Sequence, residues 1–155
     1  MSLYSGIHHA TGSVHTVLAL QGAKAAHTDG LVSEALLLGI SGGAAFGHFV
    51  FEYEGYAPHL ILLTRNTFSP LETLFDRLAL AREVLQTAKP ETGNENLRRV
   101  LDGGCPALVW ADMFSLPYNN LPKDEHMWGV MPVVVTAIEG DTALVVDRSQ
   151  RPFRV

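Results

Sequence analysis

The chain has 155 residues, of which 47% are hydrophobic and 17% are charged, so it can fold around a core and is too apolar for a disordered segment. The formal net charge is −5 and the 11 Lys and Arg residues are scattered, which argues against a nucleic-acid partner. The single cysteine, Cys105, excludes an internal disulfide and predicts a reducing, cytoplasmic location, and no apolar run approaches the about 20 residues that cross a membrane.

Helices are predicted mainly in the first part of the chain. The hydroxyl side chains of Thr11-Gly12-Ser13 precede VHTVLALQG, and they suit the N-cap of a helix that Gly22 ends. Ser33 precedes the short helical segment EALLLGI, and the small residues of SGGAAFGHF then predict a turn. Proline suits the first position of a helix, and two more helices are predicted from Pro70 and from Pro90 to Leu101.

Strands are predicted mainly in the later part of the chain, where apolar runs are bounded by turn residues. The segments HLILLT (59–64), EVLQTA (83–88) and CPALVWAD (105–112) are candidates. The clearest pair is MPVVVTAIEGDTALVVDRS, in which two apolar runs meet at the turn Glu139-Gly140-Asp141. Helices first and strands later predict an α+β fold with a largely antiparallel sheet.

Four segments together resemble one known family. HHATGS, LVSEALLLGISGGAAFGHF, LDGGCPALVWADMFSLPY and VVVTAIEGDTALVVDRS are similar to the N-terminal domain of the butirosin-biosynthesis acyltransferase family, from about Gly6 to Arg148. That domain is similar in turn to papain-like cysteine enzymes of the bacteriocin-processing peptidase type. The resemblance implies a papain-like α+β fold, with N-terminal helices packed on the sheet. We expect residues 1–155 to form a single such domain, or the N-terminal part of a longer protein.

The resemblance also implies a catalytic set, from which this sequence departs. The family has a thiol nucleophile at the N-terminus of the first long helix, a histidine base leading into the VVV strand, and an aspartate after the next strand. Here the usual His-Cys is His8-His9, so His9 occupies the nucleophile position, and Met131-Pro132 stands near the position of the base. The nearest histidine is His126, and Asp147 matches the pattern. The implied catalytic residues are therefore His9, His126 and Asp147.

Other polar residues are candidates for substrate binding, and each has a structural alternative. Ser33 and Glu34 either border the cleft or cap a helix, with the acid in its first turn. Asp112 and Tyr118 follow a buried strand, where polar side chains often border a site or cap a turn. Ser13 is the one hydroxyl near the nucleophile position. The predicted substrate-binding residues are Ser13, Ser33, Glu34, Asp112 and Tyr118.

No metal or cofactor is predicted. Adjacent residues in extended chain point to opposite sides, so His8 and His9 do not readily share one metal ion, and no His-Glu-x-x-His spacing occurs. His9 has three alternative roles, which are structural, nucleophilic and metal-binding. Trp110 and Trp128 either line an acyl or aromatic pocket or pack in the core.

Three classes of function remain open. The favoured hypothesis is a degenerate family member without the thiol nucleophile, which serves as a ligand-binding or regulatory domain. The alternative is an active acyl transferase or amide hydrolase that uses His9, Ser13 or Cys105 with His126 and Asp147. A purely structural or protein-interaction domain is the third. The expected partners are a small acyl or amine substrate, a carrier protein or a second copy of the chain, with no nucleic acid and no membrane.

Overall fold

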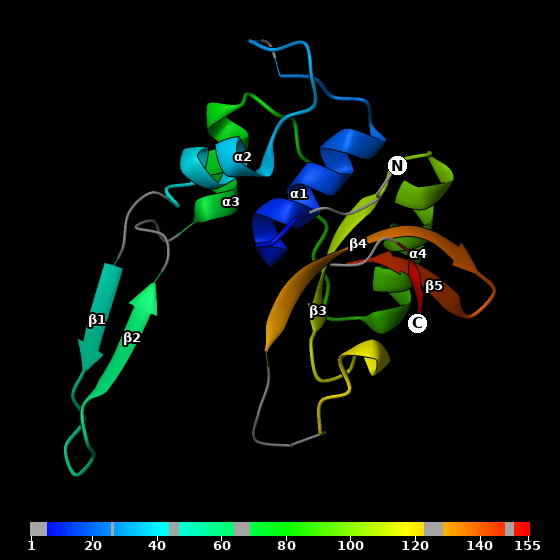
Figure 1. The fold of residues 1–155 in the computed structure, drawn as a ribbon. Helices are drawn as coiled ribbons and strands as arrows, with labels where there is room; N and C mark the ends of the chain where they lie inside the picture. Colours follow the sequence, from blue (N-terminus) through cyan, green and yellow to red (C-terminus); the bar gives the residue numbers. More distant parts are fainter. Residues whose placement is uncertain (1–5, 26, 44–46, 64–68, 123–128, 148–150) are drawn as a thin grey trace. The chain divides into compact units, whose positions relative to one another are not determined.

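The computed structural model describes residues 6–25, 27–43, 47–63, 69–122, 129–147 and 151–155 (Figure 1). Its chain divides into two compact units, one formed by residues 1–34 with 83–155 and the other by residues 35–82. None of the helices in the described ranges is long and apolar enough to cross a membrane.

The unit of residues 35–82 contains most of helix α2 (Glu34–Ile40), helix α3 (Pro70–Arg77) and a β-hairpin. Leu37 of α2 and Leu74 of α3 are fully buried, and Arg77 donates a hydrogen bond to the carbonyl oxygen of Ile40 at 2.7 Å. The start of α3 at Pro70 confirms the proline signal in the sequence.

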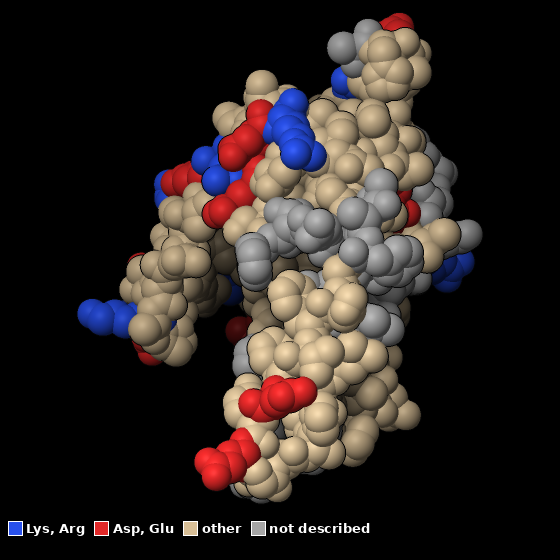
Figure 2. Space-filling view, turned by 90° about the vertical axis from the view of Figure 1, so that its left-hand side faces the viewer, with Lys and Arg blue, Asp and Glu red and all other residues tan. Residues whose placement is uncertain are grey.

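The hairpin consists of strands β1 (Gly47–Phe51) and β2 (His59–Leu63), which pair antiparallel from Gly47↔Leu63 to Phe51↔His59. Strand β1 lies in a segment for which a turn was predicted, and that prediction is wrong there. Its residues become a strand because β2 offers a partner, which is a contact outside the local sequence. Figure 2 shows a largely uncharged surface on this side of the molecule.

The unit of residues 1–34 and 83–155 is built on a four-stranded antiparallel sheet in the order β3-β4-β5-β6. Its strands are β3 (Ala107–Asp112), β4 (Val130–Glu139), β5 (Thr142–Val146) and β6 (Phe153–Arg154). The predicted hairpin is confirmed, since Glu139 pairs with Thr142 and Gly140 supplies a positive φ of 63° at the turn. The α+β class with an antiparallel sheet is therefore confirmed.

The two faces of this sheet carry different apolar clusters. One face holds Leu116, Met131, Val133, Val135 and Val145, with Leu97 and Leu101 of helix α4 (Pro90–Asp102) packed against them. The other face holds Val134 and Val146, against which Val17 of helix α1 (His9–Leu20) packs. Because side chains alternate along a strand, neighbouring residues of β4 belong to different cores.

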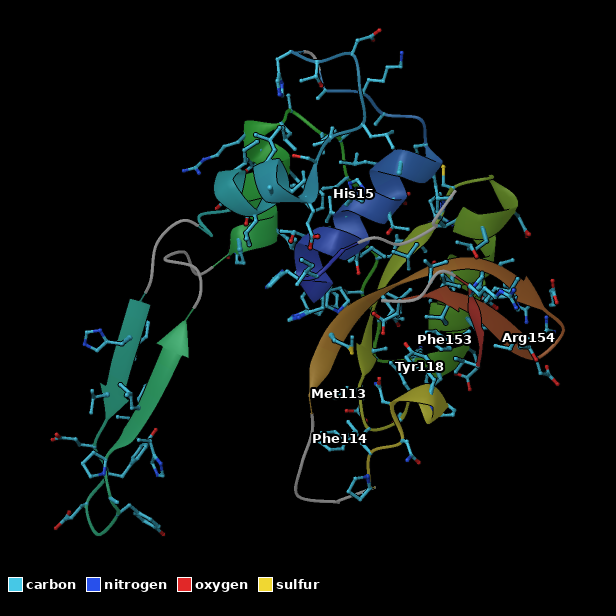
Figure 3. All side chains as sticks on the ribbon, in the orientation of Figure 1. His15, Met113, Phe114, Tyr118, Phe153 and Arg154 are labelled. Atoms are coloured by element: carbon cyan, nitrogen blue, oxygen red, sulfur yellow. The ribbon has the colours of Figure 1, made fainter. Side chains whose placement is uncertain are left out.

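Helix α1 is joined to β4 by a buried hydrogen bond. The hydroxyl of Ser13 donates to the carbonyl oxygen of Pro132 at 3.0 Å, and both residues are fully buried. The same helix is tied to the loop before α2, where Nδ1 of His15 donates to the carbonyl oxygen of Val32 at 2.7 Å (Figure 3). These contacts settle where the N-terminal half of α1 lies on the sheet.

Two further predictions from the sequence are wrong. Helix α1 begins at His9, with His8 as its N-cap, so Thr11 and Ser13 lie inside the helix and are buried. Residues 83–88 form no strand, and Val84 there is 66% exposed. An apolar run becomes a strand only where a neighbouring strand pairs with it, and the sequence of one segment does not report that neighbour.

Two hydroxyls on α1 are expected to respond oppositely to removal. Ser13→Ala leaves the buried Pro132 carbonyl without its donor and should lower the free energy of unfolding by about 1–2 kcal/mol. Thr16 is the matched control, because its buried hydroxyl has no hydrogen-bond partner within the described residues. Thr16→Val should leave stability unchanged or raise it by about 1 kcal/mol. Urea unfolding of both variants measures this, and equal losses would contradict the assignment.

Candidate functional site

The carboxylate of Glu34 lies against the start of α1. Its Oε1 accepts hydrogen bonds from the backbone nitrogens of Ile7 at 3.1 Å and His8 at 2.8 Å, and from the Thr11 hydroxyl at 3.4 Å. Its Oε2 also accepts from the Ile7 nitrogen, at 2.8 Å. A negative charge is favourable at the positive end of a helix dipole. Glu34 therefore belongs to the surroundings of His8 and His9, besides being the first residue of α2.

The two adjacent histidines form one stacked pair. Their ring centroids lie 4.7 Å apart with an interplanar angle of 23°. His8 is the N-cap of α1, where its Nδ1 accepts a hydrogen bond from the Thr11 nitrogen, so a neutral His8 ring carries its proton on Nε2. The prediction that the rings point to opposite sides is wrong, because the chain turns into the helix between them. His9 is the first helical residue and is exposed.

Ser13 follows His9 by four residues and lies on the same face of α1, one turn further on. Its hydroxyl is buried and donates a hydrogen bond to the carbonyl oxygen of Pro132. These contacts give Ser13 a packing role, and its predicted contact with a substrate stays a prediction.

Asp147 is the most buried carboxylate among the predicted site residues, with 1% of its surface exposed. Its Oδ2 accepts a hydrogen bond from the hydroxyl of Tyr118 at 3.1 Å. Tyr118 comes from the short 3-10 helix η1 (Pro117–Asn119), and its ring stacks on Phe153 of β6 with centroids 4.0 Å apart (Figure 3). Sequence reasoning named Tyr118 and Asp147 separately and missed that they pair. His126 lies outside the described residues.

Asp112, at the end of β3, closes the turn that follows it. Its Oδ2 accepts from the Ser115 hydroxyl at 2.8 Å, and its Oδ1 accepts from the nitrogens of Gly129 at 3.2 Å and Phe114 at 3.4 Å. The Ser115 hydrogen bond, followed by the one from Gly129, holds the pKa of Asp112 below its ordinary value. These contacts fit the turn-capping alternative for Asp112. Ser33 is exposed before α2, and its predicted contact with a substrate stays a prediction.

The sheet register brings three of these positions toward one end of β4. Ser13 contacts Pro132, so α1 is anchored near the beginning of the strand. Asp147 directly follows Val146, which pairs with Val134. Met131, near the position where the resemblance predicts a catalytic histidine, is buried in the cluster on the α4 face.

Cys105 lies toward the other end of this strand pair. It is exposed and precedes Ala107, which pairs with Val135, whereas Ala111 at the other end pairs with Met131. At about 3.3 Å per residue, Ala107 and Ala111 are about 13 Å apart. The only thiol of the chain is therefore separated from the start of β4.

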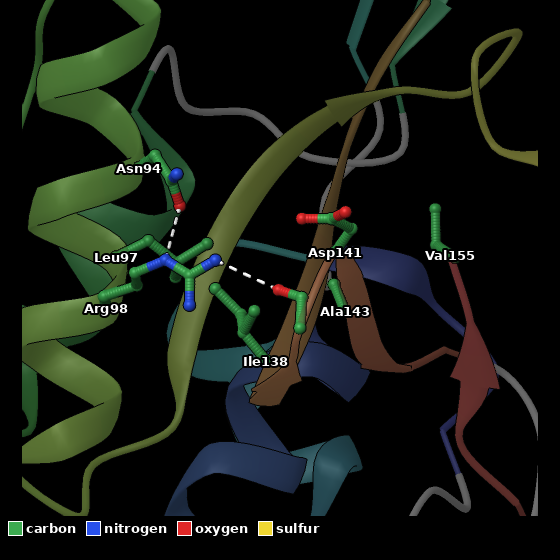
Figure 4. Close-up of a pocket in the computed structure, with 8 residues that line it drawn as sticks. Asn94, Leu97, Arg98, Ile138, Asp141, Ala143 and Val155 are labelled. Carbon is green, nitrogen blue, oxygen red and sulfur yellow. Dashed lines mark hydrogen bonds between the residues drawn. The ribbon is translucent and has the colours of Figure 1, made fainter.

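A cavity of about 290 Å³ opens elsewhere on the same unit, between α4 and the β4–β5 turn (Figure 4). Arg98 lies across it and donates to Asn94 Oδ1 at 3.2 Å and to the Gly140 carbonyl oxygen at 3.1 Å. None of the predicted site residues lines this cavity. Across the described residues, no group of three His, Cys, Asp or Glu side chains is arranged to hold a metal ion.

Comparison with known proteins identifies the family. Residues 8–148 match the family described as butirosin biosynthesis protein H, N-terminal, and the chain belongs to this family. No curated protein and no solved structure matches the chain. The family resemblance inferred from the four sequence segments is thus confirmed, while the papain-like likeness stays a prediction.

Removal of the Glu34 carboxylate is expected to loosen the start of α1. Glu34→Ala should lower the free energy of unfolding by about 1–2 kcal/mol, because two backbone nitrogens lose their acceptor, and Glu34→Gln should lower it less. Glu91→Ala, at an exposed first-turn acid of α4, is the matched control and should change stability by less than about 0.5 kcal/mol. Chemical unfolding and amide exchange of residues 8–12 measure the effect; equal losses at both sites would refute it.

Asp112 is expected to contribute stability that depends on pH. Its folded pKa is lowered, so the contribution is present above the unfolded value of about 3.9 and is lost as pH falls through the folded value. Asp112→Asn should therefore be less stable than wild type at neutral pH, and the difference should shrink below about pH 4. Urea unfolding across this range tests the sign, and a difference that grows in acid would reverse it.

Proposed function

We propose that this member of the butirosin biosynthesis protein H N-terminal family is an acyltransferase-related domain that binds a small acyl or amine ligand without thiol catalysis. The observation that carries the proposal is the chemistry at the start of α1. The imidazole of His9 is exposed there, and the only thiol, Cys105, lies toward the opposite end of β3. A thiol enzyme needs its sulfur beside its base, and removal of either group costs several orders of magnitude in rate.

The start of β4 supports the same proposal. A general base near this strand has to exchange a proton with the nucleophile, which a thioether cannot do. Met131 is buried among Leu116, Val133, Val135 and Val145, and its side chain serves the core. The two departures from the catalytic pattern that the resemblance implies, at His9 and at Met131, both support a domain that binds without thiol catalysis.

The remaining polar groups support ligand binding. Glu34 holds the backbone of Ile7 and His8, so the start of α1 is rigid before any ligand arrives. A preformed site avoids part of the entropy that binding otherwise costs. We infer that His9 contacts the ligand through its exposed ring and that Asp147 and Tyr118 keep the neighbouring strand ends in place.

One observation favours an active enzyme as the second candidate. Asp147 is almost completely buried, and a buried carboxylate is costly unless its charge is used or well compensated. In this alternative, Asp147 orients His126, and a ring nitrogen of His9 attacks the carbonyl carbon of a thioester. The C–S bond breaks as the N–acyl bond forms, and His126 takes the N–H proton of His9 and passes it to the leaving sulfur.

Intact mass and calorimetry with a panel of acyl thioesters test the two candidates. We expect reversible binding to wild type with no stable adduct. His9→Cys should gain an acyl adduct if a base remains within reach of residue 9. An adduct on wild-type His9, lost in His9→Gln, would replace the binding proposal with the enzyme.

Cys105→Ala is the matched control for the thiol. It should leave reversible binding unchanged and should not remove an adduct formed by His9→Cys. An adduct that maps to Cys105 in the wild type would contradict the separation between this thiol and the start of β4. Absence of binding by the whole panel would contradict the proposed function.

A further inference from the structure

An indole ring lies exposed on the face of the sheet that carries α1. Trp110 of β3 is 57% exposed, although tryptophan is among the most buried residues of folded proteins. It pairs with Pro132 of β4. Paired residues share a face, and two residues earlier Leu108 pairs with Val134 in the α1 cluster, so Trp110 lies on the α1 face.

The surroundings of Trp110 connect it to the start of α1. The carbonyl of its partner Pro132 accepts the hydrogen bond from Ser13, and His9 lies one turn before Ser13 on the same helix face. One helical turn is about 5.4 Å and paired strands are about 5 Å apart. The backbone of Trp110 is therefore within about 15 Å of the backbone of His9, a span that the two side chains and an acyl chain between them can bridge.

A second apolar side chain extends this surface. Val130 precedes Pro132 by two residues, so it lies on the same face, and it is 46% exposed. Its partner across the strands is Asp112, whose carboxylate is engaged by Ser115 and Gly129. We call Trp110 and Val130 the apolar platform. Its apolar groups continue toward the start of α1 without an intervening basic side chain on these strands.

We propose that the apolar platform binds the hydrocarbon part of an acyl ligand whose carbonyl end lies at His9, so that Trp110 makes the site selective for long acyl groups over acetyl. This inference rests on the proposed function and adds the ligand class. Each methylene that leaves water gains about fourfold in affinity, and an indole face covers several methylenes.

The experiment uses the octanoyl and acetyl thioesters of N-acetylcysteamine as probes. The chain has two tryptophans, so Trp128→Phe leaves Trp110 as the only indole emitter. Octanoyl binding should shift the emission to shorter wavelength, because the chain covers the ring, and acetyl should not. By calorimetry, Trp110→Ala should weaken octanoyl binding about tenfold or more and change acetyl binding by less than about twofold.

Two variants separate this effect from misfolding. Trp110→Phe keeps an aromatic face and should retain most of the octanoyl affinity. Tyr56→Ala removes an exposed aromatic ring from the other unit and should leave the octanoyl affinity unchanged. Octanoyl binding without an emission shift and without loss in Trp110→Ala would overturn the inference while the proposed function stands. Failure of both probes to bind would overturn the proposed function and the inference together.

Discussion

The contact between α1 and β4 is the constraint on which the first unit depends. Ser13 donates to the carbonyl oxygen of Pro132, 119 residues away in the sequence, and both residues are fully buried. Pro132 has β3 beside it on one side, while β5 pairs with β4 only from Val134 onward, so a proline is tolerated with its other side free of a ladder. Its carbonyl oxygen becomes the acceptor for the helix, and this fixes the start of α1 on the sheet.

The start of α1 is consequently held from several directions at once. Ser13 anchors it to the sheet, Glu34 accepts from the two backbone nitrogens just before it, and His15 donates to the loop that leads to Glu34. In a thiol enzyme such rigidity positions a nucleophile, and it remains useful when the residue at that position only binds. The same contacts hold the start of α1 in place whether His9 binds a ligand or takes part in catalysis.

Several parts of the fold and the site were predictable. The hairpin around Gly140 and the helix from Pro70 have local causes, a positive φ and a proline at the first position, and both are confirmed. The strand predicted at residues 83–88 is wrong, because no strand of the described residues pairs with this segment. The turn predicted for residues 41–49 is confirmed at 41–43 and wrong from Gly47 onward, where pairing with β2 makes β1. For the site, the family was readable from the sequence, whereas the hydrogen bond between Tyr118 and Asp147 was not.

The sequence by itself therefore determined the α+β class, the family and the chemical identity of residue 9, since these depend on composition, local pattern and residue type. Only the tertiary structure decided which partners the polar side chains have. Ser13 donates to a carbonyl oxygen, Asp112 accepts from its own turn, and Glu34 accepts from the backbone before α1. It also decided that Trp110 is exposed. The physical reason is that burial and hydrogen bonding of a side chain are set by partners far away in the sequence, and no local pattern records them.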